Sequence, residues 1–299
     1  MRPASIVRFE QLFLAAVAVD AANDVISWGA LVGAVLVAAG STACGTLSTS
    51  PAAGTFTPGT PHMLTVAMSG YPTPGFWEGT PHHPTGGFEY ELAKAMATRF
   101  GLRSVRIVVK HFHQIVAGDL GGADVALDLI TPTSEREQHL QFSTPYLTDA
   151  PTIVVRSGTL IPDLNTAQAL RWGATRATTF IGAINKWINP DLPLRIFDQE
   201  NQMLAALKRG TVDAVLEDLP AAVATARESG GKLEAAAQLP FNETIAAALP
   251  KNSNNEQAVS SAIRAFTADG TIDRLLKKWV GSAAANAETS IPLLHTTLG

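Results

Sequence analysis

The chain has 299 residues, 46% of them hydrophobic and 16% charged, and its formal net charge at pH 7 is −4. A chain of this length can bury a core of ordinary size in one or two domains. The negative charge and the lack of a long basic stretch argue against a nucleic-acid partner, because binding to a duplex requires clustered Lys and Arg.

Residues 1–43 are predicted to be an export signal rather than part of a folded domain. The apolar run at 28–39 is too short to span a bilayer as a helix, but it suits the core of a secretory signal. Small residues then precede Cys44, the only cysteine in the chain, so no intrachain disulfide can form. The arrangement resembles a bacterial lipoprotein signal, in which the cysteine is lipidated. Ser41 departs from that pattern, because an aliphatic residue is usual there, and the stretch before the apolar run is long and carries acidic residues.

Two alternatives stay open for this segment: ordinary cleavage after Ala43, or a membrane anchor that is never cleaved. All three interpretations place the rest of the chain outside the cytoplasm. A diacylglyceryl group on Cys44 would supply the more than one acyl chain that stable anchoring to the outer face of the cell membrane requires. Residues 44–61, which are rich in Ser, Thr, Pro and Gly, are predicted to be a flexible tether.

The first half of the remaining chain alternates between strand and helix patterns. Strands are predicted at 63–68, 105–109 and 124–130, helices at 88–100 and 112–120, and a loop rich in Pro, Gly and aromatic residues at 70–87. In the first helix the apolar residues Leu92, Ala95, Met96 and Phe100 share one stripe, and Gly101 is a natural stop. This alternation favours α/β units with parallel strands.

The same rhythm restarts near residue 152. Strands are predicted at 152–155, 172–175, 194–197, 212–216 and 244–249, and helices at 179–187, 201–208, 220–228, 255–266 and 271–280. Residues 282–299 are predicted to be a disordered tail. Both halves contain a strand, a polar turn and a helix start whose free N–H groups suit a carboxylate, so a ligand between two lobes is the default interpretation.

Four segments resemble the bacterial extracellular solute-binding proteins of family 3, the periplasmic amino-acid-binding proteins of ABC importers. The most specific is Thr131-Pro-Thr-Ser-Glu-Arg136 followed by Phe142-Ser-Thr-Pro-Tyr146, and the others lie at 87–96, 173–179 and 212–220. The match covers about residues 62–281.

The resemblance implies an α/β, two-lobed periplasmic-binding-protein type II (Venus-flytrap) fold. Lobe 1 would comprise residues 62–152 plus 246–281, and lobe 2 residues 153–245. Two hinge crossings, near 150–155 and 242–247, would join the lobes.

The resemblance also implies a site for the α-carboxylate of an amino acid. Arg136 would bind it through the planar fork of its guanidinium, a geometry that Lys does not offer. Thr131 would add its hydroxyl, and the main-chain N–H of Leu129 or Thr131 another donor. A zwitterion requires such fixed partners of both signs when water is expelled. The alternative for Arg136 is a surface arginine paired with a neighbouring glutamate.

From the second lobe, Thr178 and Thr179 would donate hydrogen bonds at a helix start, and Asp218 would bind the α-ammonium group. Each has a simpler alternative as a helix cap, Asp218 because it precedes the helix that begins at Pro220. Ala177 stands where the family usually has glycine, which affects how closely a ligand can approach the main chain there.

The resemblance places aromatic residues against the ligand side chain. Phe76 or Trp77, and Phe112, would pack there, with core packing as the alternative. Asp128 is unusual, because the family position is normally a small residue or an amide. It either recognises a cation of the ligand or points into a hydrogen-bonded core.

The expected protein is therefore an exported, monomeric solute-binding lipoprotein that captures an amino acid, expected to be polar, and delivers it to an ABC permease. No cofactor and no metal are expected, because His82–His83 and His111–His113 lack the one-turn spacing of a zinc helix. Three alternatives remain. The chain could be a dehydratase of the same fold acting on prephenate or arogenate, for which Glu217 and Asp128 are the candidate acids. It could also be a ligand-sensing domain for a signalling partner, or a relative that no longer binds.

Overall fold

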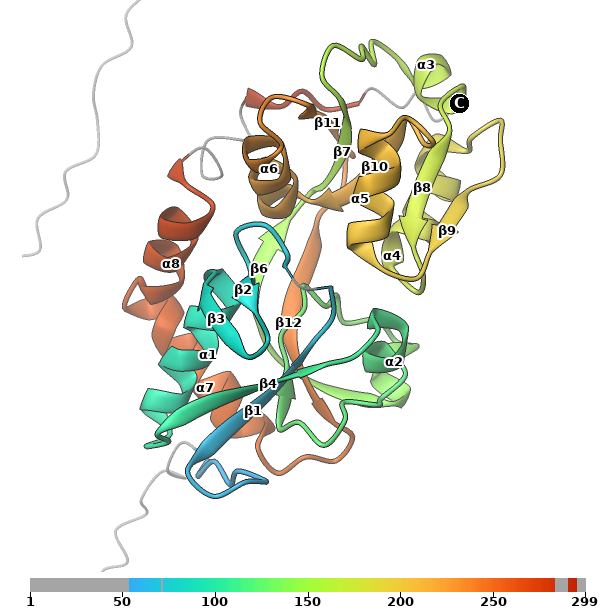
Figure 1. The fold of residues 1–299 in the computed structure, drawn as a ribbon. Coiled ribbons are helices and arrows are strands. Elements are labelled where there is room, and N and C mark those ends of the chain that lie inside the picture. The colour runs from blue at the N-terminus through green and yellow to red at the C-terminus, as the bar shows by residue number, and fades with distance from the viewer. Residues whose placement is uncertain (1–53, 71, 283–289, 295–299) are drawn as a thin grey trace, which may run out of the picture. The chain divides into compact units, whose positions relative to one another are not determined.

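The computed structural model of the protein describes residues 54–70, 72–282 and 290–294 (Figure 1). The predicted leader at 1–43, the lipidation site at Cys44 and the first part of the tether lie outside these residues. In the described part, no helix is both long and apolar enough to cross a bilayer.

Residues 54–61, predicted to belong to the tether, lie on the folded domain instead. The ring of Phe56 stacks on Phe100 with 4.3 Å between centroids and 2° between planes. The Thr57 N–H donates to the Asn255 side chain at 2.8 Å, and the Gly59 N–H donates to Asp124 at 2.7 Å. One buried aromatic ring and two long-range hydrogen bonds thus fix a segment whose composition alone favoured disorder.

The first sheet has the strand order β4-β1-β5-β12-β6. Its members are β1 (Met63–Met68), β4 (Ser104–Val109), β5 (Val125–Ala126), β6 (Leu140–Asp149) and β12 (Glu243–Pro250). The pairs of β1 with β4 and β5 are parallel, whereas β12 runs antiparallel to both of its neighbours. The sheet is therefore mixed rather than all parallel, and the strand predicted at 124–130 is reduced to two residues.

Four helices accompany this first sheet; three of them contact its strands, and the fourth, at 271–279, packs on two of the other helices. They are α1 (Phe88–Arg99), α2 (Phe112–Val116), α7 (Glu256–Ala268) and α8 (Thr271–Trp279). The predicted apolar stripe of α1 is largely buried, with Leu92 and Met96 fully inaccessible to solvent. Burial of each such side chain contributes roughly 1.5–3 kcal/mol to folding.

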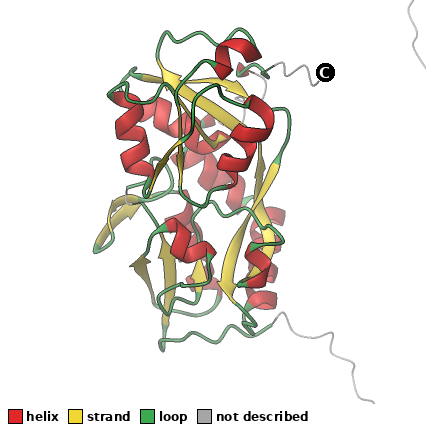
Figure 2. Ribbon diagram, turned by 90° about the vertical axis from the view of Figure 1, so that its right-hand side faces the viewer, coloured by secondary structure: helices red, strands yellow, loops and turns green. Residues whose placement is uncertain are grey.

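The second sheet has the order β11-β7-β10-β8-β9. It contains β7 (Pro151–Arg156), β8 (Trp172–Thr175), β9 (Arg195–Phe197), β10 (Ala214–Asp218) and β11 (Leu233–Gln238). The strands β10, β8 and β9 are parallel, and β7 is antiparallel to both β10 and β11. Figure 2 separates the strands of the two sheets, each with helices around it.

The helices of the second sheet are α3 (Leu164–Gln168), α4 (Thr179–Ala183), α5 (Glu200–Lys208) and α6 (Leu219–Glu228). The chain continues from α4 directly into η2 (Ile184–Ile188), a π-helical segment. The helix predicted at 179–187 is thus present but changes its winding after one turn. Such π segments are rare and often mark functional sites.

The chain passes twice between the sheets. The first passage joins β6 to β7 at Ala150, and the second joins β11 to β12 through residues 239–242. Figure 1 shows β6 and β12 running side by side toward the second sheet, in agreement with their antiparallel pairing. We call the first sheet with its four helices the first lobe, and the second sheet with its four helices the second lobe. All described residues belong to one compact unit.

The loop predicted at 70–87 contains a short hairpin that the sequence analysis did not predict. The strands β2 (Glu78–Thr80) and β3 (His83–Gly86) pair antiparallel. Gly87, which ends the hairpin, has φ +114°, and a Cβ atom there would lie 2.0 Å from the carbonyl oxygen of Phe76. Only glycine fits this position, because both the main-chain conformation and the close approach exclude a side chain.

Residues 290–294, which the sequence analysis assigned to the tail, lie along β11. The N–H of Gln238 donates to the Pro292 carbonyl at 2.8 Å, and the N–H of Leu294 donates back to the Gln238 carbonyl at 2.8 Å. The Leu294 side chain is 3% exposed and joins the core of the second lobe. A free sheet edge and an apolar anchor order this segment, a long-range effect that composition does not reveal.

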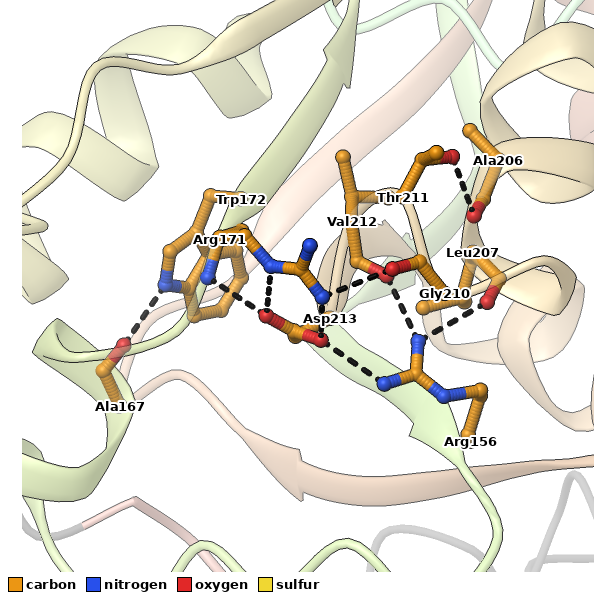
Figure 3. Close-up of polar contacts among 10 residues, drawn as sticks. All are labelled: Arg156, Ala167, Arg171, Trp172, Ala206, Leu207, Gly210, Thr211, Val212 and Asp213. Carbon is orange, nitrogen blue, oxygen red and sulfur yellow. Dashed lines mark hydrogen bonds and ion pairs between the residues drawn. The ribbon is translucent and has the colours of Figure 1, made fainter.

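Two arginines bind Asp213, which directly precedes β10 in the second lobe (Figure 3). Arg171 binds both carboxylate oxygens, at 2.6 and 2.7 Å, and Arg156 binds Oδ1 at 2.8 Å. Arg156 also donates to the carbonyls of Leu207 and Val212. The hydrogen bonds from Arg171 first, and those from Arg156, hold the pKa of Asp213 well below its usual range. The network joins β7, the start of β8 and the turn between α5 and β10.

Replacing Asp213 with alanine is expected to lower the free energy of unfolding by about 2 kcal/mol, because two guanidinium groups lose a common, partly buried carboxylate partner. The matched control is Asp198→Ala, which breaks the exposed pair with Arg176, where both side chains are more than half exposed. This control is expected to change stability far less, because exposed ion pairs contribute little to folding. Urea denaturation of both variants measures the difference, and equal losses would contradict a structural role for the network.

Candidate ligand-binding site

A cavity of about 70 Å³ lies between the two lobes and is lined by residues from both. The cavity is small, so it limits the ligand to a small solute unless the lobes separate. It brings together nine of the ten residues that the resemblance assigned to the ligand: Trp77, Phe112, Asp128, Leu129, Thr131, Arg136, Thr178, Thr179 and Asp218.

Phe76 does not line the cavity. Its side chain is fully buried in the core of the first lobe, where its ring meets Phe88 edge-on at 5.6 Å. The neighbouring Trp77 lines the cavity instead, and its indole N–H donates to Glu89 at 2.8 Å. For this pair of adjacent aromatic residues, the core alternative holds for Phe76.

Arg136 is the first residue of a 3₁₀ turn, η1 (Arg136–Gln138), and is only 6% exposed. Its guanidinium donates to the Thr131 carbonyl at 2.7 Å and to the Ala177 carbonyl at 2.9 Å, and lies 5.3 Å from the ring centre of Phe112. Because Ala177 belongs to the second lobe, this side chain bridges the cavity. Burial lowers the pKa of Arg136, while Glu243 and Asp218 favour its charged form.

No ion pair of Arg136 occurs within the part of the chain that the structure describes, although its nearest electrostatic partners are carboxylates. Both hydrogen bonds from its guanidinium go to main-chain carbonyls. The alternative of a surface arginine is therefore wrong. A guanidinium with a partly uncompensated charge in a cavity is suited to an incoming anion.

Glu243, at the start of β12, was not predicted as a site residue. Its Oε2 accepts from the hydroxyl of Thr131 at 2.8 Å and from that of Thr179 at 2.9 Å. Since Thr131 belongs to the first lobe and Thr179 to the second, one carboxylate oxygen links the two. Both hydroxyl groups are thus engaged with the protein in this conformation. No local sequence signal indicates the link, because the partners lie 112 and 64 residues away.

The turn before α4 carries Ala177 with φ +64°, in the left-handed region that favours glycine. A non-glycine residue costs roughly 1–2 kcal/mol there. Strain of this kind often occurs at functional sites, and here it directs the Ala177 carbonyl toward Arg136. Thr178 is the N-cap residue of α4 by position, but its hydroxyl donates to the Thr175 carbonyl at 2.8 Å and makes no capping bond.

Asp218 ends β10 and precedes α6, with Pro220 in the first turn of the helix. Its side chain makes no capping hydrogen bond, so the predicted alternative of a simple helix cap does not apply. The residue is 7% exposed and lines the cavity. An acidic side chain is therefore present in the same cavity as Arg136.

Glu89, the second residue of α1, lines the cavity and was also missed. It accepts hydrogen bonds from Trp77 Nε1 at 2.8 Å, from the Leu129 N–H at 2.9 Å and from the Tyr146 hydroxyl. Burial raises its pKa to about 6 even though the three donors favour the charged form. Because the Leu129 N–H is used here, Thr131 is the remaining main-chain donor candidate of the two that the sequence analysis considered.

Asp128 and Glu200 complete the polar lining. The Oδ1 of Asp128 accepts from the Ser69 N–H at 3.0 Å, whereas its Oδ2 is buried and has no partner within the described part of the chain. Burial first, and the neighbouring Glu89 second, raise the pKa of Asp128 well above its usual range. Glu200, the first residue of α5, lines the cavity beside Glu217. Within the described residues, no cluster of His, Cys, Asp and Glu is arranged to hold a metal ion.

The sequence model of the bacterial extracellular solute-binding proteins, family 3, matches residues 64–282. The chain belongs to this family. A relative from Escherichia coli strain K12, the L-cystine-binding protein TcyJ, is 25% identical over 225 residues, which cover 73% of this chain and 83% of the relative.

Two solved structures of family members have similar folds. The solute receptor for L-cysteine of Neisseria gonorrhoeae has a TM-score of 0.66 and 25% identity, covering 76% of this chain and 93% of the receptor. An ancestral arginine-binding protein bound to arginine has a TM-score of 0.64 and 27% identity, covering 73% and 98% respectively. These similarities confirm the predicted two-lobed type II periplasmic-binding-protein fold.

Proposed function

We propose that the protein captures a polar amino acid between its two lobes outside the cytoplasm and presents it to an ABC permease. The observation that carries this proposal is the buried Arg136 guanidinium, which lacks a direct ion pair in the described part of the chain and shares a cavity with Asp218. A fixed cation and a fixed anion in one small, enclosed space match the two charges of an amino-acid zwitterion.

In this proposal the α-carboxylate binds the Arg136 guanidinium, with Thr131, Thr178 and Thr179 as further donors. Asp218 binds the α-ammonium group. Trp77 and Phe112 contact the side chain. The hydroxyls that now bind Glu243 exchange this partner for the ligand.

Lobe closure follows from the same contacts. Arg136 and Glu243 each touch groups of both lobes, so the closed arrangement already forms bonds that an open one lacks. The two passages between the sheets, at Ala150 and at residues 239–242, are short enough to act as a hinge. A ligand favours the closed form only to the extent that it adds contacts there.

The relatives support the class of ligand. The similar proteins from Escherichia coli and Neisseria gonorrhoeae are described as binding L-cystine and L-cysteine, and the ancestral structure holds arginine. These solutes share the α-amino and α-carboxylate groups and differ in the side chain. We further propose the lobe boundaries given above, export with lipidation at Cys44, and action as a monomer.

The second candidate is a dehydratase of the same fold, because a carboxyl group with a raised pKa can act as a general acid. Asp128 lines the cavity and has such a pKa, whereas Glu217, the other candidate acid, does not line it. Because only one of the two candidate acids lines the cavity, this alternative has less support than the binding function.

The test is thermal unfolding of the full-length chain in detergent with each of the twenty amino acids, cystine, prephenate and arogenate. A ligand present at a thousand times its dissociation constant stabilises by about 4 kcal/mol. For a folded part of this size, the midpoint is expected to rise by roughly 8–16 °C. A shift with one or two amino acids that are recovered unchanged supports binding. A shift with prephenate or arogenate alone, accompanied by turnover, supports the dehydratase instead.

A further inference from the structure

Acidic side chains outnumber basic ones in the lining of the cavity. Four carboxyl groups line it, those of Glu89, Asp128, Glu200 and Asp218, whereas Arg136 is the one cationic side chain among the described lining residues. An amino acid with a neutral side chain has no net charge. Its α-groups would use Arg136 and Asp218 and leave the other three carboxyl groups in place. The cavity therefore contains more acid than a simple zwitterion requires.

Asp128 provides an independent indication of a missing ligand group. Its Oδ1 is fixed by the Ser69 N–H, but its Oδ2 is buried and has no hydrogen-bond partner among the residues that the structure describes. The large majority of buried side-chain polar atoms in folded proteins have such a partner. An unsatisfied oxygen on a residue that lines the cavity is an acceptor available to the solute.

Glu200 approaches the same region from the opposite lobe. It begins α5 of the second lobe, yet its Oε2 is close to the loop after β1 of the first lobe. An ideal Cβ at Gly70 would lie 3.7 Å from this oxygen and 3.8 Å from the Thr73 hydroxyl. Side-chain hydrogen bonds to Glu217 and Thr73 hold the Glu200 carboxyl group there, and both it and Asp128 line the cavity.

Glu89 differs from Asp128, because Trp77, Leu129 and Tyr146 already donate to it. It adds negative potential but no unused acceptor comparable to that of Asp128. The pair formed by Asp128 and Glu200 is thus the part of the lining that the α-groups of a ligand leave unexplained.

We propose that the solute carries a second cationic group in its side chain, as in arginine, lysine or ornithine, and that this group lies against Asp128 and Glu200. The proposal rests on the proposed function, because it assumes that the α-groups bind Arg136 and Asp218. A side-chain cation would convert an unsatisfied acceptor into a charge-assisted hydrogen bond, which is about twice as strong as a neutral one. In its absence, burial favours the protonated forms of Asp128 and Glu200.

The experiment is isothermal titration of the full-length protein with pairs of amino acids that differ mainly in charge: arginine against citrulline, and lysine against norleucine. The cationic member of at least one pair is expected to bind roughly 10–100 times more tightly than its neutral partner. Asp128→Asn keeps the acceptor for Ser69 but removes the charge. It is expected to weaken the cationic ligand about tenfold or more and to change the neutral one by less than about threefold.

Asp191→Asn is the matched control. Asp191 is exposed and outside the cavity, so this variant changes the net charge equally and is expected to leave all affinities unchanged. Glu200→Gln tests the second carboxyl group and is expected to act in the same direction as Asp128→Asn. If Asp128→Asn does not fold, Glu200→Gln and the matched pairs on the unaltered protein still decide the question.

The possible outcomes distinguish a failure of this proposal from a failure of the proposed function. If neutral and cationic members bind equally and Arg136→Ala removes both, the second cationic group is wrong and amino-acid binding stands. If no amino acid binds, both proposals fall. A cationic preference that survives Asp128→Asn and Glu200→Gln together would also overturn the assignment.

Discussion

Replacing Arg136 with alanine is expected to weaken amino-acid binding by at least about a hundredfold. In the proposed complex the guanidinium is the sole cationic partner of the ligand carboxylate among the described lining residues, and it is 6% exposed. Loss of one partner from a desolvated charge pair costs 2–5 kcal/mol or more, much of it from leaving the other charge unpaired. Titration calorimetry with the amino acid that gives the largest thermal shift measures the loss.

Two further variants sharpen this result. Arg136→Lys retains a charge but not the planar fork, so it is expected to recover only part of the affinity. Arg264→Ala removes an exposed arginine that donates to the Thr144 hydroxyl at 3.0 Å, away from the cavity, and is expected to bind normally. Unchanged binding by Arg136→Ala would exclude this site for the carboxylate.

The stability of the ligand-free variant is a separate readout. Arg136 bonds to the carbonyls of Thr131 and Ala177, and the alanine variant loses both bonds. It also removes a buried charge whose desolvation is unfavourable, as the lowered pKa of Arg136 indicates. These effects oppose each other, so a moderate change in the unfolding midpoint is compatible with a large loss of affinity.

Local sequence signals predicted the part of the site that lies close together in the chain. Thr131 and Arg136 belong to one turn, Thr178 and Thr179 to one helix start, and a strand-to-helix junction carries Asp218. The adjacent pair Phe76 and Trp77 could not be separated in advance. Their orientation depends on the hairpin at 78–86 and on Gly87, whose main-chain conformation no periodicity describes.

Contacts between distant segments were not predictable in the same way. Glu243 joins Thr131 to Thr179, and Glu200 reaches the loop after β1, only because two lobes fold against each other. Glu89 lies in a recognised segment, but its role follows from the burial of Trp77 and Tyr146 around it.

The strands β6 and β11 were not predicted, because their local sequences do not show a regular strand pattern. The sequence of β11 is Leu-Glu-Ala-Ala-Ala-Gln, which has a high helix propensity. Antiparallel pairing with β7 overrides that propensity. In β6 the alternation is interrupted by Pro145, where the pairing with β12 also shifts register.

Four buried carboxyl groups are expected to make the ligand-free protein less stable as the pH rises from about 4.5 to 7. The pKa of Glu89 rises from 4.5 to about 6 on folding, and those of Asp128, Glu200 and Glu217 are also raised, chiefly by burial. A raised pKa means that the folded state binds the proton more tightly. The stabilisation from Glu89 is therefore fully present below pH 4.5 and is lost as the pH passes 6. For Glu89 alone, this corresponds to about 2 kcal/mol.

Carboxylates with a lowered pKa affect the free energy of unfolding in a different, more acidic pH range. The contribution of Asp213 is present above pH 4 and is lost only as the pH falls further toward its depressed pKa. Between pH 5 and 7 the buried acids consequently dominate the slope. Urea denaturation at several pH values in this range is expected to give a decreasing free energy of unfolding, and an increase would contradict the protonation of these groups.

Glu89→Gln tests how much Glu89, whose pKa lies between pH 5 and 7, contributes to the pH dependence of the free energy of unfolding. Glutamine keeps one oxygen for Tyr146 and Leu129, but its amide nitrogen cannot accept from Trp77. The variant is expected to lose about 1–3 kcal/mol at every pH. Its slope between pH 5 and 7 is expected to be shallower than that of the unaltered protein, because one titrating group has been removed. Asp191→Asn, which removes an exposed carboxylate, is expected to leave the slope unchanged. A slope that persists in Glu89→Gln would assign the pH dependence to Asp128 and to the Glu200–Glu217 pair, the groups on which the proposed cation subsite depends.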